Sequence, residues 1–267
     1  MKLVGSPVKQ AAEAAGIEVF QPPSARGPEM IERLTALAPD VAVVVAYGKI
    51  LPGELLEVPA KGFVNLHFSL LPSYRGAAPV QRAIMNGDET TGVAVMVLTE
   101  GMDEGPVLAL RQETIDPDDT SNSLGERLAA IGAPLLVETL GPYVRGEIEP
   151  VAQDDSLATY AGKISTEDAR IDWSADARSI RDLVRALDPD PGAWTMLEGT
   201  RLKVLRATVA DHPELPPGEI ATGPGLVVGT GSRPLLLEEV QPATKKRMSG
   251  ADFARGARLD DGLRMGG

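Results

Sequence analysis

The fold is decided by the segment Phe63-Val64-Asn65-Leu66-His67-Phe68-Ser69-Leu70-Leu71-Pro72, in which a short apolar run ends in polar side chains and a proline turn. Two similar apolar runs, at residues 41–46 and 93–98, lie on either side of it and are rich in valine. Short, nearly continuous apolar runs are typical of strands that are buried on both faces of a sheet. The three runs therefore predict the central strands of one sheet.

Helical patterns separate and follow these predicted strands. Amphipathic stretches occur at residues 28–38, 77–85 and 123–140, and a shorter helix begins near Pro7. Strands that alternate with helices indicate an α/β domain with a mainly parallel sheet.

A second domain is predicted after a change of composition. Gly141-Pro142 and the polar stretch 146–156 read as a boundary, so we expect a first domain at 1–145, a linker at 146–161 and a second domain at 162–267. The second domain contains short strand candidates divided by glycine-rich turns, at residues 201–208, 218–221, 226–230 and 235–240. Their spacing predicts a small β-barrel, and residues 256–267 are expected to lack regular structure.

Composition excludes several classes of function. The chain has no cysteine and only two histidines, far apart, so disulfides, thiolate catalysis and a metal site are not expected. The formal charge of −12 disfavours indiscriminate binding to nucleic acid. Neither a membrane-spanning apolar run nor a secretory signal is present, so we expect a cytoplasmic protein.

Three polar side chains stand out near the predicted strand ends. Asn65 and His67 are two residues apart and therefore project from the same side of a strand. Ligands of open α/β sheets bind at the carboxyl ends of the strands. The glycine-flanked turn that contains Asp103 follows the 93–98 run, and we expect adjacent strands to bring Asp103 toward His67.

An Asn, a His and an Asp in this arrangement suit acyl transfer to an amine. Asn65 and His67 would stabilise the oxyanion that forms at the attacked carbonyl carbon, and Asp103 would orient His67. Either Asp103 or His67 could relay the proton of the amine, and the sequence leaves that route open. A lone His and Asn at a strand end are also commonly structural polar groups.

The same segment closely resembles the active-site signature of methionyl-tRNA formyltransferases. Further segments resemble the family in the family's order: residues 43–52, 65–82, 102–105, 169–174 and 245–249. The resemblance implies a Rossmann-like formyltransferase domain joined to an OB-fold-like domain that helps to hold tRNA. It also implies transfer of a formyl group from 10-formyltetrahydrofolate, a consumed donor, to the methionine amino group of initiator methionyl-tRNA, by a protein that needs no metal. A monomer is expected.

The family's functional residues transfer to positions of this sequence that match its motifs. Asn65, His67 and Asp103 match the catalytic residues. The resemblance further implies folate contacts for Ser69, Leu70, Leu71 and Pro72, a border of the pterin pocket for Tyr47 and Ile50, and tRNA phosphate contacts for Lys245, Lys246 and Arg247.

The resemblance is incomplete at the amino terminus. The family begins with a strand, a glycine-rich turn, a helix and a second strand, whereas this chain enters a helix near Pro7, so we expect the Rossmann-like domain to lack its first strands. Either translation starts here or the sequence begins at an internal Met codon of a longer reading frame, and we favour the second. Loss of such strands would expose apolar faces and an unpaired sheet edge.

Two other functions remain as alternatives. Related formyltransferases act on a nucleotide or a nucleotide sugar, but residues 171–174 and the Lys245-Lys246 turn favour the tRNA enzyme. An inactive, truncated remnant that binds tRNA or folate is the second alternative, against which the retained Asn65, His67 and Asp103 argue. Trp173 and Trp194 are candidates for stacking on bases, although Trp194 is better explained as core packing.

Overall fold

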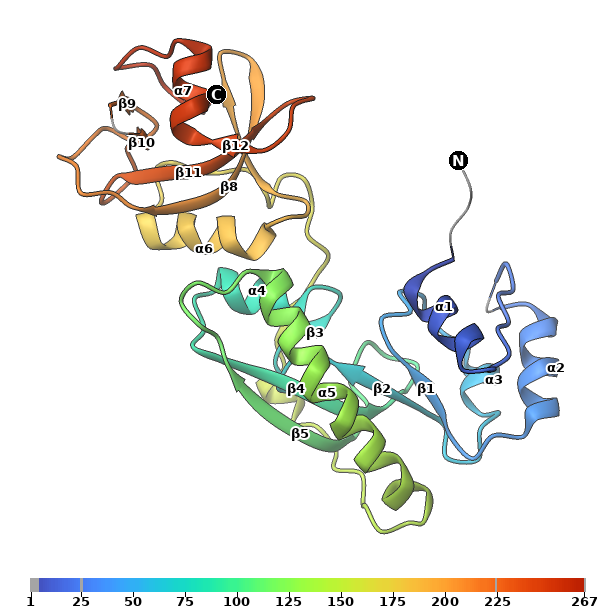
Figure 1. Cartoon of the computed structure of the whole chain (residues 1–267). Helices are drawn as coiled ribbons and strands as arrows, with labels where there is room; N and C mark the ends of the chain where they lie inside the picture. The colour runs from blue at the N-terminus through green and yellow to red at the C-terminus, as the bar shows by residue number, and fades with distance from the viewer. Residues whose placement is uncertain (1–4, 25, 224, 267) are drawn as a thin grey trace.

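The computed structural model describes residues 5–24, 26–223 and 225–266, which form an α/β part, a connecting segment and a β-rich part (Figure 1). In the α/β part the strands are β1 (Ala42–Val44), β2 (Phe63–His67), β4 (Thr90–Val97) and β5 (Val107–Thr114). The helices are α1 (Pro7–Ala14), α2 (Pro28–Leu37), α3 (Gly53–Leu56), α4 (Pro79–Met85) and α5 (Ser121–Val144).

The four strands form one sheet in the order β1-β2-β4-β5. The α/β class is confirmed, with one refinement: β1 and β2 are parallel, whereas β2–β4 and β4–β5 are antiparallel. His67, at the end of β2, pairs with Ala94 near the start of β4, so the connection that contains α4 returns to β4 without crossing the sheet. The apolar patterns missed β5, because only its first four residues are apolar and the second half, residues 111–114, is polar.

Helix α5 covers one face of this sheet. It begins with a capping box in which Thr120 and Ser123 satisfy each other's backbone N–H groups, and all of its leucines except the partly buried Leu140 are buried in the core. Gly132 lies where a Cβ atom would come within 2.9 Å of Leu66 in β2. This close approach seals the core directly behind the strand that carries Asn65 and His67.

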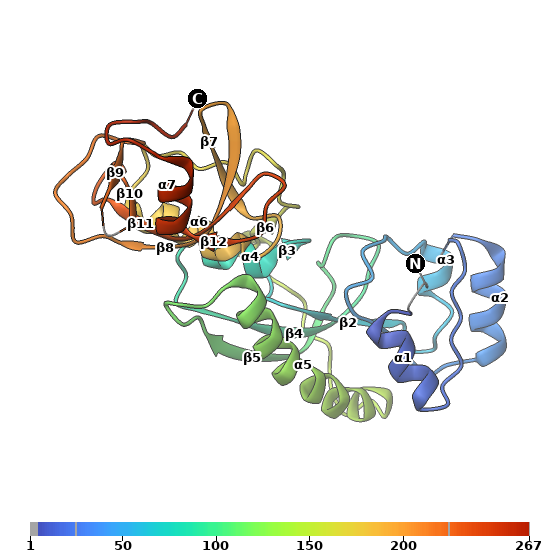
Figure 2. The same ribbon diagram turned by 45° about the horizontal axis from the view of Figure 1, so that its top comes forward.

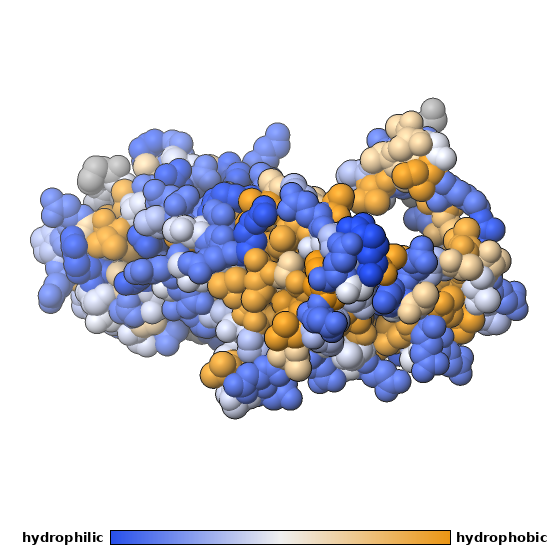
Figure 3. Space-filling model, turned by 90° about the horizontal axis from the view of Figure 1, so that it is seen from below, coloured by the Kyte–Doolittle hydropathy of each residue, from blue (hydrophilic) through white to orange (hydrophobic). Residues whose placement is uncertain are grey.

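The edge of the sheet formed by β1 is less covered. Within the described residues β1 has β2 as its strand partner, and Val43 and Val45 are 43% and 49% exposed. A separate small core of Leu51, Leu55 and Phe63 joins α3 and β2 to α2. Figure 3 shows apolar residues gathered on the face of the molecule seen from below.

The β-rich part forms a second, mostly antiparallel sheet in the order β7-β8-β11-β10-β9, with β12 paired to β11. Its strands are β7 (Ala193–Leu197), β8 (Thr200–Val209), β9 (Ile220–Thr222), β10 (Leu226–Val228), β11 (Leu235–Pro242) and β12 (Met248–Ser249), with helices α6 (Ala177–Leu187) and α7 (Gly250–Ala257). The four predicted strands correspond to β8, β9, β10 and β11. Residues 256–257 belong to α7, and the described residues after them form neither a helix nor a strand, in line with the prediction for 256–267. The segment is nevertheless attached to the core, because Met265 is 4% exposed and forms an isolated bridge with Leu197.

The connecting segment is itself structured. It contains a 3₁₀-helix, η1 (Asp155–Leu157), and the short strand β6 (Tyr160–Ala161), which pairs in parallel with β3 (Arg75–Gly76) of the α/β part. No helix within the described ranges is long and apolar enough to cross a lipid bilayer.

Helix α6 joins the two parts. It lies against α4 in both views of the ribbon (Figures 1 and 2) and also packs on β8. Asp182 of α6 is 2% exposed and accepts a hydrogen bond from Arg185 Nε at 2.8 Å. Arg185 in turn donates to the carbonyl of Asp119, ahead of α5, at 3.1 Å. The carboxylate of Asp182 thus orients a guanidinium that ties the two parts together.

We expect Asp182→Ala to lower the free energy of unfolding by about 3 kcal/mol, because it leaves a mostly buried guanidinium without its partner. Glu219→Ala, which removes the partly exposed ion pair with Arg264, is the matched control and should cost less than about 1 kcal/mol. Urea unfolding followed by circular dichroism measures both. Equal effects of the two substitutions would contradict this account of the junction.

Candidate functional site

His67 is the most constrained of the predicted catalytic side chains. It ends β2, is 6% exposed, and its Nε2 lies 2.9 Å from the carbonyl oxygen of Tyr74. A carbonyl oxygen only accepts, so Nε2 carries the hydrogen of this bond. The other ring nitrogen, Nδ1, lies 3.7 Å from Asp103 Oδ2, which is an electrostatic contact longer than a hydrogen bond. The predicted proximity of His67 and Asp103 is therefore observed.

Tyr74 supplies that carbonyl from an unusual backbone conformation. Its φ of 59° lies in the left-handed region, which a non-glycine residue adopts at a cost. The conformation is held at both ends: the Tyr74 hydroxyl donates to Asp88 at 2.6 Å and accepts from Asn86, while its N–H donates to Thr159 Oγ1 at 2.8 Å. Burial, followed by the hydrogen bond to Asp88, raises the pKa of Tyr74 to about 12.

Asp103 reaches His67 because the 98–105 turn folds back on β4. Gly105 is required there, since a Cβ atom would lie 1.8 Å from the Val97 carbonyl oxygen. Asp103 also has a left-handed backbone, with φ 51°, and its Oδ2 accepts the Gly76 N–H at 2.9 Å. Asp103 and His67 do lie close together, as expected. The reason differs from the expected one: β2 and β4 are antiparallel, and the 98–105 turn brings Asp103 back toward His67.

Asn65 lies two residues before His67 on β2, paired with Val44 and Met96 in the neighbouring strands. Its side chain is partly exposed and forms no hydrogen bond to any other residue in the described ranges. A polar amide with free donors, on the same strand as His67 and two residues before it, is available to a ligand.

The turn predicted to contact folate follows directly. Ser69 is fully buried and its hydroxyl donates to the Ser73 carbonyl at 2.6 Å, so it shapes the turn from inside. Leu71 is also buried, packed with Ala94 and Met96, whereas Leu70 and Pro72 are partly exposed. Of these four residues, Leu70 and Pro72 are therefore the ones whose side chains a ligand could contact.

Tyr47 and Ile50 lie on the loop after β1 and are 44% and 69% exposed. Within the described residues no hydrogen bond links either of them to the Ser69–Pro72 turn. The predicted tRNA contacts are on the other part of the molecule, in the turn between β11 and β12. Lys245 and Lys246 are exposed there, while Arg247 pairs with Asp188 at 2.7 Å and with Glu239 at 3.7 Å.

The two tryptophans are core residues. Trp173 and Trp194 are 4% and 8% exposed, and their indole nitrogens donate to Thr195 and to the Thr166 carbonyl. Stacking of either ring on a base is thereby corrected to core packing, because apolar burial and an internal hydrogen bond satisfy both ends of the ring.

Sequence patterns missed the residues that the connecting segment brings to the site. Gln153 donates to the carbonyls of Asp103 and Gly105 and accepts from Arg75 Nε, and Arg75 is 2% exposed. Thr159 and Ala161 bond to the backbone of residues 72–78. The only hint in the sequence was Arg75-Gly76 beside the turn, since the polar composition of 146–156 is typical of a linker.

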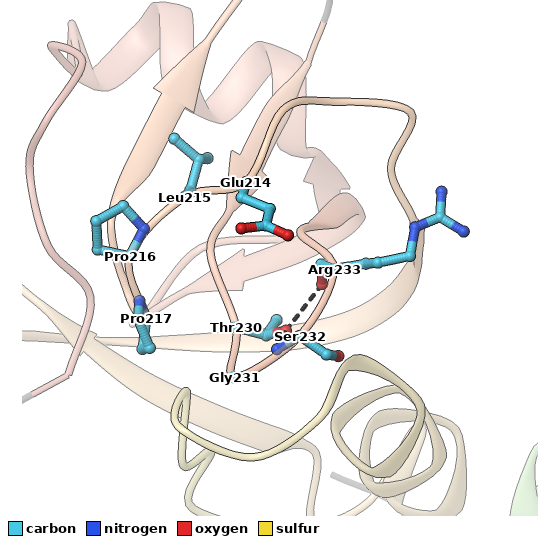
Figure 4. Close-up of a pocket in the computed structure, with 8 residues that line it drawn as sticks. All are labelled: Glu214, Leu215, Pro216, Pro217, Thr230, Gly231, Ser232 and Arg233. Atoms are coloured by element: carbon cyan, nitrogen blue, oxygen red, sulfur yellow. Dashed lines mark hydrogen bonds between the residues drawn. The ribbon is translucent and has the colours of Figure 1, made fainter.

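A cleft of about 580 Å³ lies in the β-rich part, far from these residues in the sequence and lined by Glu214, Leu215, Pro216, Pro217, Thr230, Gly231, Ser232 and Arg233. A hydrogen bond from Thr230 to the Arg233 carbonyl closes its loop, and the Arg233 side chain extends away from the other lining residues (Figure 4). None of the predicted site residues lines this cleft. In the part of the chain that the structure describes, no group of three or more His, Asp or Glu side chains is arranged to hold a metal ion.

Two family models match the chain. "Formyl transferase" matches residues 2–140 and "Formyl transferase, C-terminal domain" matches residues 163–258. A methionyl-tRNA formyltransferase of Streptomyces coelicolor is 50% identical over 267 residues, covering 99% of this chain and 86% of that protein. A methionyl-tRNA formyltransferase of Thermobifida fusca is 48% identical with the same coverage.

Solved structures share the fold at lower identity. HypX from Aquifex aeolicus in complex with tetrahydrofolic acid aligns with a TM-score of 0.67 at 21% identity, over 85% of this chain and 41% of that chain. An N-formyltransferase from Helicobacter canadensis, in complex with folinic acid and dTDP-3-aminofucose, also aligns with a TM-score of 0.67, at 17% identity, over 88% of this chain and 84% of that chain.

The raised pKa of Tyr74 predicts a pH-dependent contribution to stability. The folded state favours the neutral phenol, so this contribution is complete below the unfolded pKa of about 10 and is lost as the pH rises toward about 12. We expect the difference in free energy of unfolding between wild type and Tyr74→Phe to shift in favour of the variant above pH ~10. Urea titrations from neutral to alkaline pH measure it, and a difference that is independent of pH would contradict the assignment.

Proposed function

This chain belongs to the methionyl-tRNA formyltransferase family, and on that premise we propose that it transfers a formyl group from 10-formyltetrahydrofolate to the amino group of methionyl initiator tRNA. The observation that carries the proposal is the contact of the His67 imidazole with the Asp103 carboxylate, beside an Asn65 amide that lies two residues before His67 on β2 and has no hydrogen-bond partner in the described residues. This function implies a cytoplasmic location, with initiator tRNA and folate as partners.

The reaction needs a nucleophile, a site for negative charge and a route for one proton. The amino nitrogen of the methionyl group attacks the formyl carbon, a new N–C bond forms, and the bond from that carbon to N10 of the folate breaks. The amine loses one proton and N10 gains one. The protein's task is to align the two substrates and to stabilise the charge that develops on the formyl oxygen.

Each of the three side chains has a role that fits its surroundings. The Asn65 amide donates to the formyl oxygen as it becomes an oxyanion, because its donors are not used elsewhere in the described chain. Asp103 takes the proton of the attacking amine on Oδ1, since Oδ2 already accepts the Gly76 N–H. His67, held at Nε2 by the Tyr74 carbonyl, faces Asp103 with Nδ1 and orients its carboxylate.

The folate is proposed to lie along the turn that follows β2. Leu70 and Pro72 offer partly exposed surface to it, while Ser69 and Leu71 hold the shape of the turn. Tyr47 and Ile50, exposed on the loop after β1, border the pterin in this proposal.

Single substitutions test the catalytic roles. We expect Asn65→Ala, His67→Ala and Asp103→Ala each to lower kcat/KM for formylation of methionyl initiator tRNA by about 100-fold or more. His212→Ala is the matched control, because His212 is the other histidine and its ring contacts the adjacent Pro213 carbonyl at the surface. Folding is checked by circular dichroism. Near wild-type activity of folded His67→Ala or Asn65→Ala would refute the assignment.

In the same proposal Lys245 and Lys246 contact tRNA phosphates. They are exposed and unpaired in the described chain, whereas Arg247 is already engaged by Asp188 and Glu239. Local contacts of this kind are compatible with the net charge of −12.

We expect Lys245→Ala/Lys246→Ala to raise KM for tRNA, to leave kcat nearly unchanged, and to reduce the slope of log KM against log salt by about 2. Arg247→Ala should change the salt slope less, because its charge is compensated within the fold. Formylation assays over a salt series give the three slopes. An unchanged slope in the double variant would rule out phosphate contacts at this turn.

A further inference from the structure

We propose that Gln153, in the segment between the two parts of the molecule, is a positioning residue that holds the Asp103 turn in the geometry needed for catalysis. The catalytic aspect rests on the proposed function of Asp103. The segment would then be a component of the active site in addition to a connection between domains.

The Gln153 side chain uses its whole amide. Nε2 donates to the carbonyl of Asp103 at 2.8 Å and to the carbonyl of Gly105 at 2.7 Å. Oε1 accepts from Arg75 Nε at 3.0 Å. A single side chain therefore fixes two carbonyls of the acidic turn and, through Arg75, the loop that follows β2.

The Asp103 turn requires such support. Its left-handed φ of 51° is unfavourable for a residue with a side chain, and surrounding contacts must maintain it. The Asp103 carboxylate is held by the Gly76 N–H, and the Asp103 carbonyl is held by Gln153. Without Gln153 the peptide that follows Asp103 is free to rotate, and the carboxylate no longer points at His67.

The loop on the other side of the carboxylate is held by the same segment. Gly76 has φ 119°, and a Cβ atom there would lie 2.7 Å from the Ala161 carbonyl oxygen. That carbonyl accepts the N–H groups of Ala77 and Ala78 at 2.8 and 3.1 Å. Residues 153–161 thus bond both to the Asp103 turn and to the 75–78 loop that donates to its carboxylate. Within this segment Gln153 is the residue whose side chain reaches the Asp103 backbone.

The isosteric substitution Gln153→Glu is the sharpest test. It keeps the acceptor for Arg75 but replaces an amide that donates to two carbonyls by a carboxylate that repels them. Gln153→Met removes the donors without adding charge. We expect both variants to lower kcat by about 10- to 100-fold, with KM for tRNA and folate within about threefold of wild type, because a misplaced group costs rate more than binding.

Asp155→Ala is the matched control. Asp155 lies in the same segment and pairs with the same Arg75 at 2.8 Å, but its side chain is 84% exposed and has no hydrogen bond to the Asp103 turn within the described residues. It should change kcat by less than about threefold. An equal loss of kcat in Asp155→Ala, or a loss confined to KM in the Gln153 variants, would show that the segment only tethers the loop and would overturn the proposal.

A second readout does not depend on activity. The chain has two histidines, His67 in the site and His212 at the surface, so NMR spectra of histidine-labelled protein contain one reporter and one internal reference. We expect Gln153→Glu and Gln153→Met to move the His67 imidazole signals and to leave those of His212 in place. If wild type forms no formyl-methionyl-tRNA, the proposed function fails, and unchanged His67 signals in both variants would separately overturn the positioning role.

Discussion

The site depends on the hydrogen bond between His67 Nε2 and the Tyr74 carbonyl. That bond fixes the imidazole at the end of β2 and determines which nitrogen faces Asp103. It exists only because Tyr74 holds a left-handed backbone, and Tyr74 holds it because Asp88, Asn86 and Thr159 restrain its two ends. Two of the non-glycine residues with a left-handed backbone, Tyr74 and Asp103, thus lie where the proposed chemistry occurs, as is common at functional sites.

In the proposed function the α/β part carries the catalytic residues and the β-rich part contacts tRNA. The two parts are joined by several packed and hydrogen-bonded elements as well as by the connecting segment. Helix α6 packs on α4, Asp182 and Arg185 tie it to the loop before α5, and β6 adds to β3 beside the site. A tRNA held by the β-rich part would consequently be held in a defined relation to Asn65 and His67. Rigid coupling of this kind limits the search for a productive geometry between two large substrates.

Much of this architecture was accessible from the sequence, because buried strands and amphipathic helices leave strong periodic patterns. The predicted strands at 41–46, 63–67 and 93–98 correspond to β1, β2 and β4. The spacing of two residues was enough to place Asn65 and His67 on the same side of β2. β5 was not predicted, because the apolar signal of this edge strand stops after four residues. The antiparallel direction of β4 was not predicted, because the same apolar run fits a parallel or an antiparallel neighbour. Gln153 escaped because its role depends on contacts with residues about fifty positions away, which no local pattern encodes.

The pairing of β3 with β6 has a consequence for folding during synthesis on the ribosome. Arg75 and Gly76 meet Tyr160 and Ala161, so the loop beside His67 lacks its partner strand until those later residues have been synthesised. A nascent chain that already contains Asn65, His67 and Asp103 still lacks Thr159, which accepts the Tyr74 N–H, and Gln153, which holds the acidic turn. The order of synthesis therefore delays assembly of a competent site until the connection to the second part has emerged.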